Sequence, residues 1–122
     1  MSHILIIDDE KFFRDIVVQM LQQDGHKTTE ADDGGKAMVL LQHTHPDLII
    51  TDILMPHMDC VEFIMELAKQ SKNIPLIAMS GGRHSISSSF NLESAKLLEA
   101  RVTLAKPFNQ AKLRAAIQEA LA

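Results

Sequence analysis

The chain has 122 residues, of which 46% are apolar, so it is long enough to bury one sizeable core and too apolar to be disordered. Its formal net charge of −4, without a basic block, argues against direct nucleic-acid binding. No apolar run approaches the ~18–20 residues of a membrane span, and no signal-peptide pattern is present. The single cysteine, Cys60, fits a reducing compartment. We therefore expect one cytoplasmic domain over residues 1–122, without membrane insertion.

The first half of the chain alternates strand and helix patterns. His3–Ile7 is an apolar run that ends on carboxylates, which predicts a strand buried on both faces. Apolar residues at helical spacing from Phe13 to Leu21 predict a helix, which Asp24-Gly25 ends. Lys27–Ala31 is short and polar, as in an edge strand. The next four residues, Asp32-Asp33-Gly34-Gly35, are predicted to form a turn.

The alternation continues to the end of the chain. A helical stripe begins at Ala37 and stops at His45-Pro46, and the apolar run at 47–52 predicts a third strand. Further strands are predicted over Leu76–Met79 and Val102–Ala105. The remaining helices are expected from Cys60, over about Phe90–Ala100, and after the N-cap Asn109. Five strands alternating with five helices indicate a doubly wound α/β fold with a parallel sheet.

Polar residues follow four of the five predicted strands at their carboxyl ends. They are Asp8 and Asp9 after the first strand, Asp52 at the end of the third, Ser80 after the fourth and Lys106 after the fifth. Ligands of open parallel sheets bind at this edge. If the first and third strands are neighbours, three carboxylates converge there, and their repulsion calls for a cation. Oxygen ligands without histidine or cysteine favour Mg²⁺ over zinc.

These residues have the parts needed for phosphoryl transfer to an aspartate. Asp52 offers a carboxylate nucleophile, Lys106 a point charge for a phosphoryl oxygen, and Ser80 a hydroxyl donor. Taken in order, Asp8-Asp9, Asp52 with Met55-Pro56, Ser80 and Lys106-Pro107-Phe108 resemble the receiver domain of two-component response regulators. The resemblance covers the whole chain and implies a flavodoxin-like sheet with the strand order 2-1-3-4-5.

The resemblance also implies a role for each residue. Asp52 would accept a phosphoryl group from a phosphohistidine on a histidine kinase or phosphotransfer protein. Asp9, Asp52 and the backbone carbonyl of Leu54 would bind Mg²⁺ directly, and Asp8 would act mainly through a metal-bound water. Lys106 would contact the phosphoryl group, and its bond to Pro107 is typically cis in the family.

The resemblance further implies a binding output. Ser80 would be the switch hydroxyl, with Thr103 and Phe108 in the switch and output region. Receivers often carry Tyr or Phe at the position of Thr103, so we expect the loop after Ser80 to carry more of the switch here. The output face would comprise the fourth helix, fifth strand and fifth helix, roughly Phe90–Ala122. It would bind a downstream protein target, from a monomer or weak dimer.

Three other interpretations compete with a stand-alone switch. The first is a receiver module separated from a larger multidomain regulator or kinase. An aspartate-nucleophile phosphatase would need a second aspartate where Leu54 stands, so we expect a phosphoryl acceptor rather than a turnover enzyme. A flavodoxin would need a phosphate-cradling loop after the first strand, where Asp8-Asp9-Glu10 would repel the flavin phosphate.

Overall fold

A computed structural model describes residues 2–52, 74–80 and 102–122 of the chain. All five predicted strands are present within these residues, and the three helices described confirm three of the five predicted ones. The helices predicted from Cys60 and over Phe90–Ala100 lie outside the described residues. The elements are β1 (His3–Ile7), α1 (Lys11–Gln23), β2 (Lys27–Ala31), α2 (Gly34–Leu41), β3 (Leu48–Asp52), β4 (Leu76–Ser80), β5 (Val102–Ala105) and α5 (Gln110–Leu121).

The five strands form one parallel sheet in the order β2-β1-β3-β4-β5, which confirms the predicted fold and strand order. The polar strand β2 lies at one edge, as its composition predicts. β1 and β3 are direct neighbours, with Ile7 opposite Thr51 in the register. The reversal of strand order therefore falls between β1 and β3, at the position where such sheets bind ligands.

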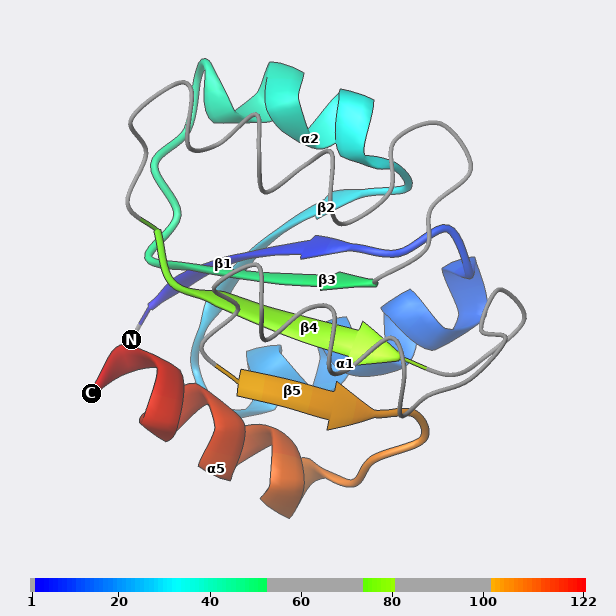
Figure 1. Cartoon of the computed structure of the whole chain (residues 1–122), viewed down its shortest axis with the longest axis vertical. Coiled ribbons are helices and arrows are strands. Elements are labelled where there is room, and N and C mark those ends of the chain that lie inside the picture. The colour runs from blue at the N-terminus through cyan, green and yellow to red at the C-terminus, as the bar shows by residue number, and fades with distance from the viewer. Residues whose placement is uncertain (1, 53–73, 81–101) are drawn as a thin grey trace.

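Helices cover both faces of the sheet, with α2 on one side and α1 and α5 on the other (Figure 1). Because side chains alternate along a strand, β1 contributes Leu5 and Ile7 to the α2 face and Ile4 and Ile6 to the opposite face. All four side chains are buried. Burial on both faces explains why the central strands are continuous apolar runs rather than alternating patterns.

The turn prediction for residues 32–35 is wrong in its second half. Gly34 and Gly35 form the first turn of α2, and only Asp32 and Asp33 precede the helix. The reason is the N-cap: the Asp33 side chain accepts a hydrogen bond of 2.8 Å from the backbone N–H of Lys36. This bond satisfies a free N–H of the first helical turn, which offsets the low helix propensity of glycine.

A polar link joins α1 to α5 at the end of the sheet opposite the acidic residues. Arg114 donates two hydrogen bonds to Asp24, from Nε to Oδ2 at 2.8 Å and from Nη2 to Oδ1 at 2.7 Å. Gln110 donates to the same carboxylate and to the backbone oxygen of Met20. Asp24 is the C-cap of α1, so this link fixes the end of α1 against the first turns of α5.

None of the helices within the described residues is long and apolar enough to cross a bilayer.

The link between Asp24 and Arg114 predicts an acid-dependent loss of stability. The hydrogen bonds from Arg114 lower the pKa of Asp24 below its usual value. A carboxyl group with a lowered folded-state pKa stabilises the protein above its unfolded-state pKa, and this contribution is lost as the pH falls through the lowered value. In denaturant unfolding, Asp24→Asn should therefore be less stable than the wild type at neutral pH and equal to it in strong acid.

The matched control is Asp15→Asn, which breaks an exposed pair with Lys11 on the same helix. It should leave stability nearly unchanged at both pH values. A difference between wild type and Asp24→Asn that persists unchanged in strong acid would contradict the proposed contribution of the Asp24 charge.

Candidate functional site

The strand register places Asp8 and Asp52 side by side at the carboxyl edge of the sheet. Each lies one residue beyond the paired Ile7 and Thr51, on the face of the sheet that α1 and α5 cover. Asp8 is 0% exposed and Asp52 is 2% exposed. Removing carboxylates from water to this extent costs free energy unless they are paired, so their surroundings determine whether the site is tolerated.

Lys106 supplies the pairing charge and directly follows β5, which lies two strands away from β3. Its Nζ atom lies 2.7 Å from Asp8 Oδ2 and 2.9 Å from Asp52 Oδ2, and its side chain is only 4% exposed. Adjacent strands are roughly 4.8 Å apart, so only a long side chain can cross β4 to reach both carboxylates. The bond between Lys106 and Pro107 is cis, as the resemblance implied.

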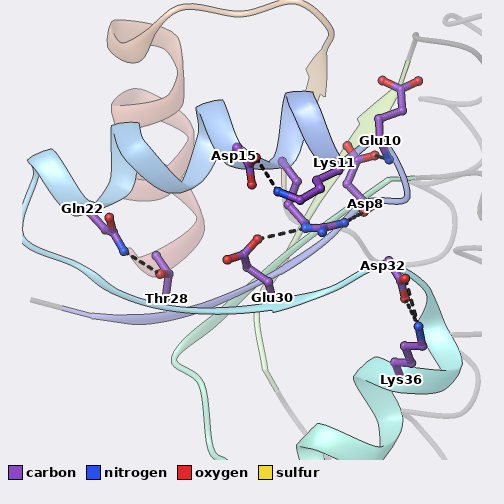
Figure 2. Close-up of polar contacts among 10 residues, drawn as sticks. Asp8, Glu10, Lys11, Asp15, Gln22, Thr28, Glu30, Asp32 and Lys36 are labelled. Carbon is purple, nitrogen blue, oxygen red and sulfur yellow. Dashed lines mark hydrogen bonds and ion pairs between the residues drawn. The ribbon is translucent and has the colours of Figure 1, made fainter.

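Asp8 is held through both of its side-chain oxygens and through its backbone oxygen. The N–H of Glu10 donates to Asp8 Oδ1 at 2.9 Å, while Oδ2 faces Lys106. Arg14 donates from Nη1 to the backbone oxygen of Asp8 and from Nε to Glu30 on β2. Figure 2 shows Asp8 and Glu10 at the start of α1, with Glu30 on the neighbouring strand. The start of α1 is thereby tied to β1 and β2.

The site carries more negative than positive charge. The Glu10 carboxylate lies 3.8 Å from Lys106 Nζ, so one ammonium group faces three carboxylates, and Asp9 adds a fourth acidic side chain to the cluster. Burial raises the pKa of Asp8 above its usual value despite the hydrogen bond from Lys106. Burial alone would lower the pKa of Lys106, but Asp8 and Asp52 together outweigh it and raise that pKa.

The three aspartates are arranged so that one small cation would fit among them. One oxygen each from Asp8, Asp9 and Asp52 lies within 4.8 Å of the others. Opposite ligands of Mg²⁺ are about 4.2 Å apart, twice its bond length of about 2.1 Å, so small side-chain movements would bring these oxygens to one ion. Both oxygens of Asp8 already face donors, which suits its predicted contact through water. The residues present therefore fit Mg²⁺.

Four of the predicted site residues are brought together, namely Asp8, Asp9, Asp52 and Lys106. Ser80 ends β4 opposite Ala105, one position beyond the Met79 that pairs with Asp52. Leu54, the predicted backbone ligand, lies outside the described residues. The predictions for Ser80 and Leu54 therefore remain predictions.

Thr103 and Phe108, which with Ser80 make up the predicted switch and output residues, lie on β5 and between β5 and α5. Thr103 is partly buried on β5 opposite Ala78. Phe108 packs edge-on against Phe13 of α1, with 5.5 Å between ring centroids. The sequence analysis did not identify Glu10, Phe13 or Arg14 as neighbours of the site. The acidic run Asp8-Asp9-Glu10 could have indicated that Glu10 lies beside the site. Phe13 was interpreted only as one residue of an apolar helix face.

Comparison with known proteins identifies the class. Residues 4–118 match the family model described as the response regulator receiver domain. The chain therefore belongs to the response regulator receiver family, which confirms the resemblance drawn from its sequence.

Individual relatives agree with this class. The chain is 33% identical to a probable transcriptional regulator, ycf27, of Cyanophora paradoxa over 97% of its own length and 47% of that protein. It is 29% identical to sporulation initiation phosphotransferase F of Bacillus subtilis, over 97% of this chain and 92% of that protein. The structure of chemotaxis response regulator CheY4 of Vibrio cholerae superimposes with a TM-score of 0.87 at 30% identity, covering 99% of both chains. The chain thus spans about half the length of the ycf27 relatives.

The ion cluster predicts that Lys106 stabilises the metal-free protein. Lys106→Met would leave Asp8 and Asp52 buried without their cation, which should cost about 3 kcal/mol of unfolding free energy. Added Mg²⁺ should restore most of this loss, because the ion would replace the missing charge. Denaturant unfolding with and without Mg²⁺ measures both effects.

The control is Lys112→Met, which removes an exposed lysine from α5. It should change stability by less than about 0.5 kcal/mol and should not alter the response to Mg²⁺. If Lys106→Met proved as stable as Lys112→Met without Mg²⁺, the ammonium would not be what makes the buried carboxylates tolerable.

Proposed function

We propose that the protein is a phosphoacceptor signalling switch in which Asp52 receives a phosphoryl group. The single observation that carries the proposal is the contact of Lys106 Nζ with Asp52 Oδ2 at 2.9 Å, beside the converging carboxylates of Asp8 and Asp9. A nucleophilic carboxylate, a candidate cation site and a buried ammonium are thereby gathered at one edge of the sheet. Membership of the receiver family supports the same conclusion.

The proposed donor is a phosphohistidine on a histidine kinase or phosphotransfer protein. A carboxylate oxygen of Asp52 forms the bond to phosphorus while the bond from phosphorus to the imidazole nitrogen breaks. The nitrogen keeps the electron pair and takes up a proton. Lys106 already lies beside the acceptor oxygen, so its ammonium would face the charged oxygens of the group being transferred.

Mg²⁺ is the proposed cofactor, held by Asp9, Asp52 and the backbone carbonyl of Leu54, with Asp8 acting through water. When bound, it would neutralise negative charge on the phosphoryl oxygens. Asp8 keeps its orientation through the Glu10 N–H, and Arg14 fixes the backbone on which Asp8 stands. These contacts fix the position of Asp8, and Lys106 reaches the same site from the end of β5.

The proposed output is a change in binding rather than catalytic turnover. Ser80 would sense the phosphoryl group, and the response would pass to the face that includes β5 and α5. Thr103 lies on β5, and Phe108 lies in the segment between β5 and α5. The remainder of the proposed face, residues 90–101, lies outside the described residues. The proposed partner is a downstream protein target, bound in the cytoplasm by a monomer or weak dimer, with no direct contact to nucleic acid.

The partial coverage of the ycf27 relatives favours a second form of the same function. Those relatives are about twice as long as the matched region, whereas CheY4 is matched over 99% of its chain. The receiver could therefore pass its signal to an attached domain instead of a separate protein. The phosphoryl-transfer chemistry at Asp52 is the same in both forms.

Incubation with Mg²⁺ and acetyl phosphate tests the proposed acceptor. Intact-mass measurement should show the gain of a single phosphoryl group that is stable in acid and labile in base. Asp52→Asn should lose it, because an amide is too poor a nucleophile to replace the carboxylate. Asp47→Asn, at the exposed residue directly before β3, is the matched control and should be phosphorylated like the wild type. Continuous release of phosphate without accumulation of the phosphoprotein would instead indicate a turnover enzyme.

The metal ligands are tested by Mg²⁺ binding in the absence of any phosphodonor. Asp9→Asn should weaken Mg²⁺ binding about tenfold, because the number of ligand charges sets the affinity of such sites. Titration calorimetry or amide chemical shifts would measure the affinity. Asp32→Asn, at an exposed pair with Lys36 on the same edge of the sheet, should bind Mg²⁺ like the wild type. Equal affinity in Asp9→Asn and Asp32→Asn would remove Asp9 from the site.

A further inference from the structure

An aromatic ring also contacts the lysine of the acidic cluster. The Nζ atom of Lys106 lies 4.5 Å from the centroid of the Phe13 ring. Phe13 belongs to the first turn of α1, and its ring meets that of Phe108 at an interplanar angle of 90°. Both rings are partly buried against the core that α1 and α5 share. Phe13 is thus fixed on one side by Phe108 while the ammonium group lies over its face.

The geometry matches a cation–π contact. The face of an aromatic ring is negative, and it attracts an ammonium group within about 6 Å of the centroid. The attraction is strongest where water is excluded, and the Lys106 side chain is only 4% exposed. Within the described residues, the charged groups that lie within 4 Å of Lys106 Nζ are the carboxylates of Asp8, Glu10 and Asp52. Phe13 is therefore a neutral partner among anionic ones.

The difference between the neutral ring and the anionic carboxylates matters when the site binds a metal ion and a phosphoryl group. In the proposed reaction, Asp52 bonds to phosphorus, and the acidic side chains share their oxygens with a divalent cation. Each of these changes weakens the hold of the carboxylates on Lys106. The Phe13 ring has no oxygen to give to a metal and no bond to form with phosphorus, so its contact with the ammonium can persist throughout.

We propose that Phe13 is a positioning residue that holds the Lys106 ammonium over Asp52 while the carboxylates exchange their partners. The inference rests on the proposed function, because it concerns the step in which Asp52 is phosphorylated. The Phe13 ring contacts the Lys106 ammonium, so its proposed effect on the reaction passes through Lys106. The competing interpretation is that Phe13 only fills space in the core, in which case leucine would serve equally well.

The first test observes the contact without any phosphoryl chemistry. In NMR spectra of the ¹³C-lysine-labelled protein, the ε-protons of Lys106 should be shifted upfield by the ring current of Phe13, with Lys106→Arg giving the assignment. The shift should persist in Phe13→Tyr and be lost in Phe13→Leu. Phe12→Leu is the matched control, because Phe12 is the adjacent residue and is 81% exposed. It should keep the shift.

The second test measures the rate at which acetyl phosphate and Mg²⁺ phosphorylate the protein. Phe13→Leu should be slower by up to about thirtyfold, which is the scale of one desolvated cation–π contact. Phe13→Tyr should restore the rate, and Phe12→Leu should match the wild type. Phenylalanine analogues with increasing numbers of ring fluorines at position 13 should slow the reaction progressively, since fluorine withdraws charge from the ring face at nearly constant shape.

The outcomes separate the inference from the proposed function. If the wild type is phosphorylated and Phe13→Leu or the fluorinated series reacts at the wild-type rate, Phe13 is only a core residue and the inference is overturned. If the wild type takes no phosphoryl group, the proposed function fails first, and the NMR shift alone still reports whether the ring contacts Lys106. Should Phe13→Leu fail to fold, the fluorinated series decides, because it preserves the packing against Phe108.

Discussion

The structure depends on one buried ammonium group among several carboxylates. Asp8 and Asp52 are both almost completely removed from water, and Lys106 is the cation that contacts both of them. Desolvation would make either carboxylate costly alone, and their mutual repulsion adds to that cost. The lysine offsets much of this, but it also faces Glu10 and leaves an excess of negative charge. Such a site is tolerable when metal-free and still attracts a second cation, which is the property that a Mg²⁺-dependent phosphoryl acceptor requires.

The rest of the fold places the groups of this cluster. Parallel pairing of β1 with β3 sets Asp8 beside Asp52, and β5 brings Lys106 from across β4. Helix α1 is joined to the C-terminal segment at both of its ends, through Phe13 and Phe108 near the site and through Asp24 and Arg114 at the far end. Lys106, which would face the phosphoryl group, therefore lies two positions before Phe108, whose ring packs against Phe13 of α1. A displacement of Lys106 would therefore first change the position of the segment between β5 and α5.

Much of this was predictable from the sequence because it follows from short-range patterns. Apolar runs ending in Asp8 and Asp52 predicted both the strands and the edge at which their carboxylates meet. Two features escaped prediction for physical reasons. The start of α2 at Gly34 depends on the Asp33 cap, which outweighs the low helix propensity of two glycines. The contact of Phe13 with Lys106 depends on the distance between α1 and β5 in the folded protein. Helical periodicity assigns Phe13 to the buried face of its helix, but it does not identify the side chain from elsewhere in the chain that contacts this face.

The lysine is best understood as a competitor as well as a partner. Its ammonium binds the same carboxylates that would hold a metal ion, so an incoming ion must share or displace those contacts. A lysine held by carboxylates alone would then be free to leave the site when it is most needed, as negative charge builds on the transferred group. A contact that does not involve a metal ligand would keep the lysine in place when the ion binds. An aromatic face is one of the few neutral groups that attract a cation. The Phe13 ring occupies the position from which it can do so.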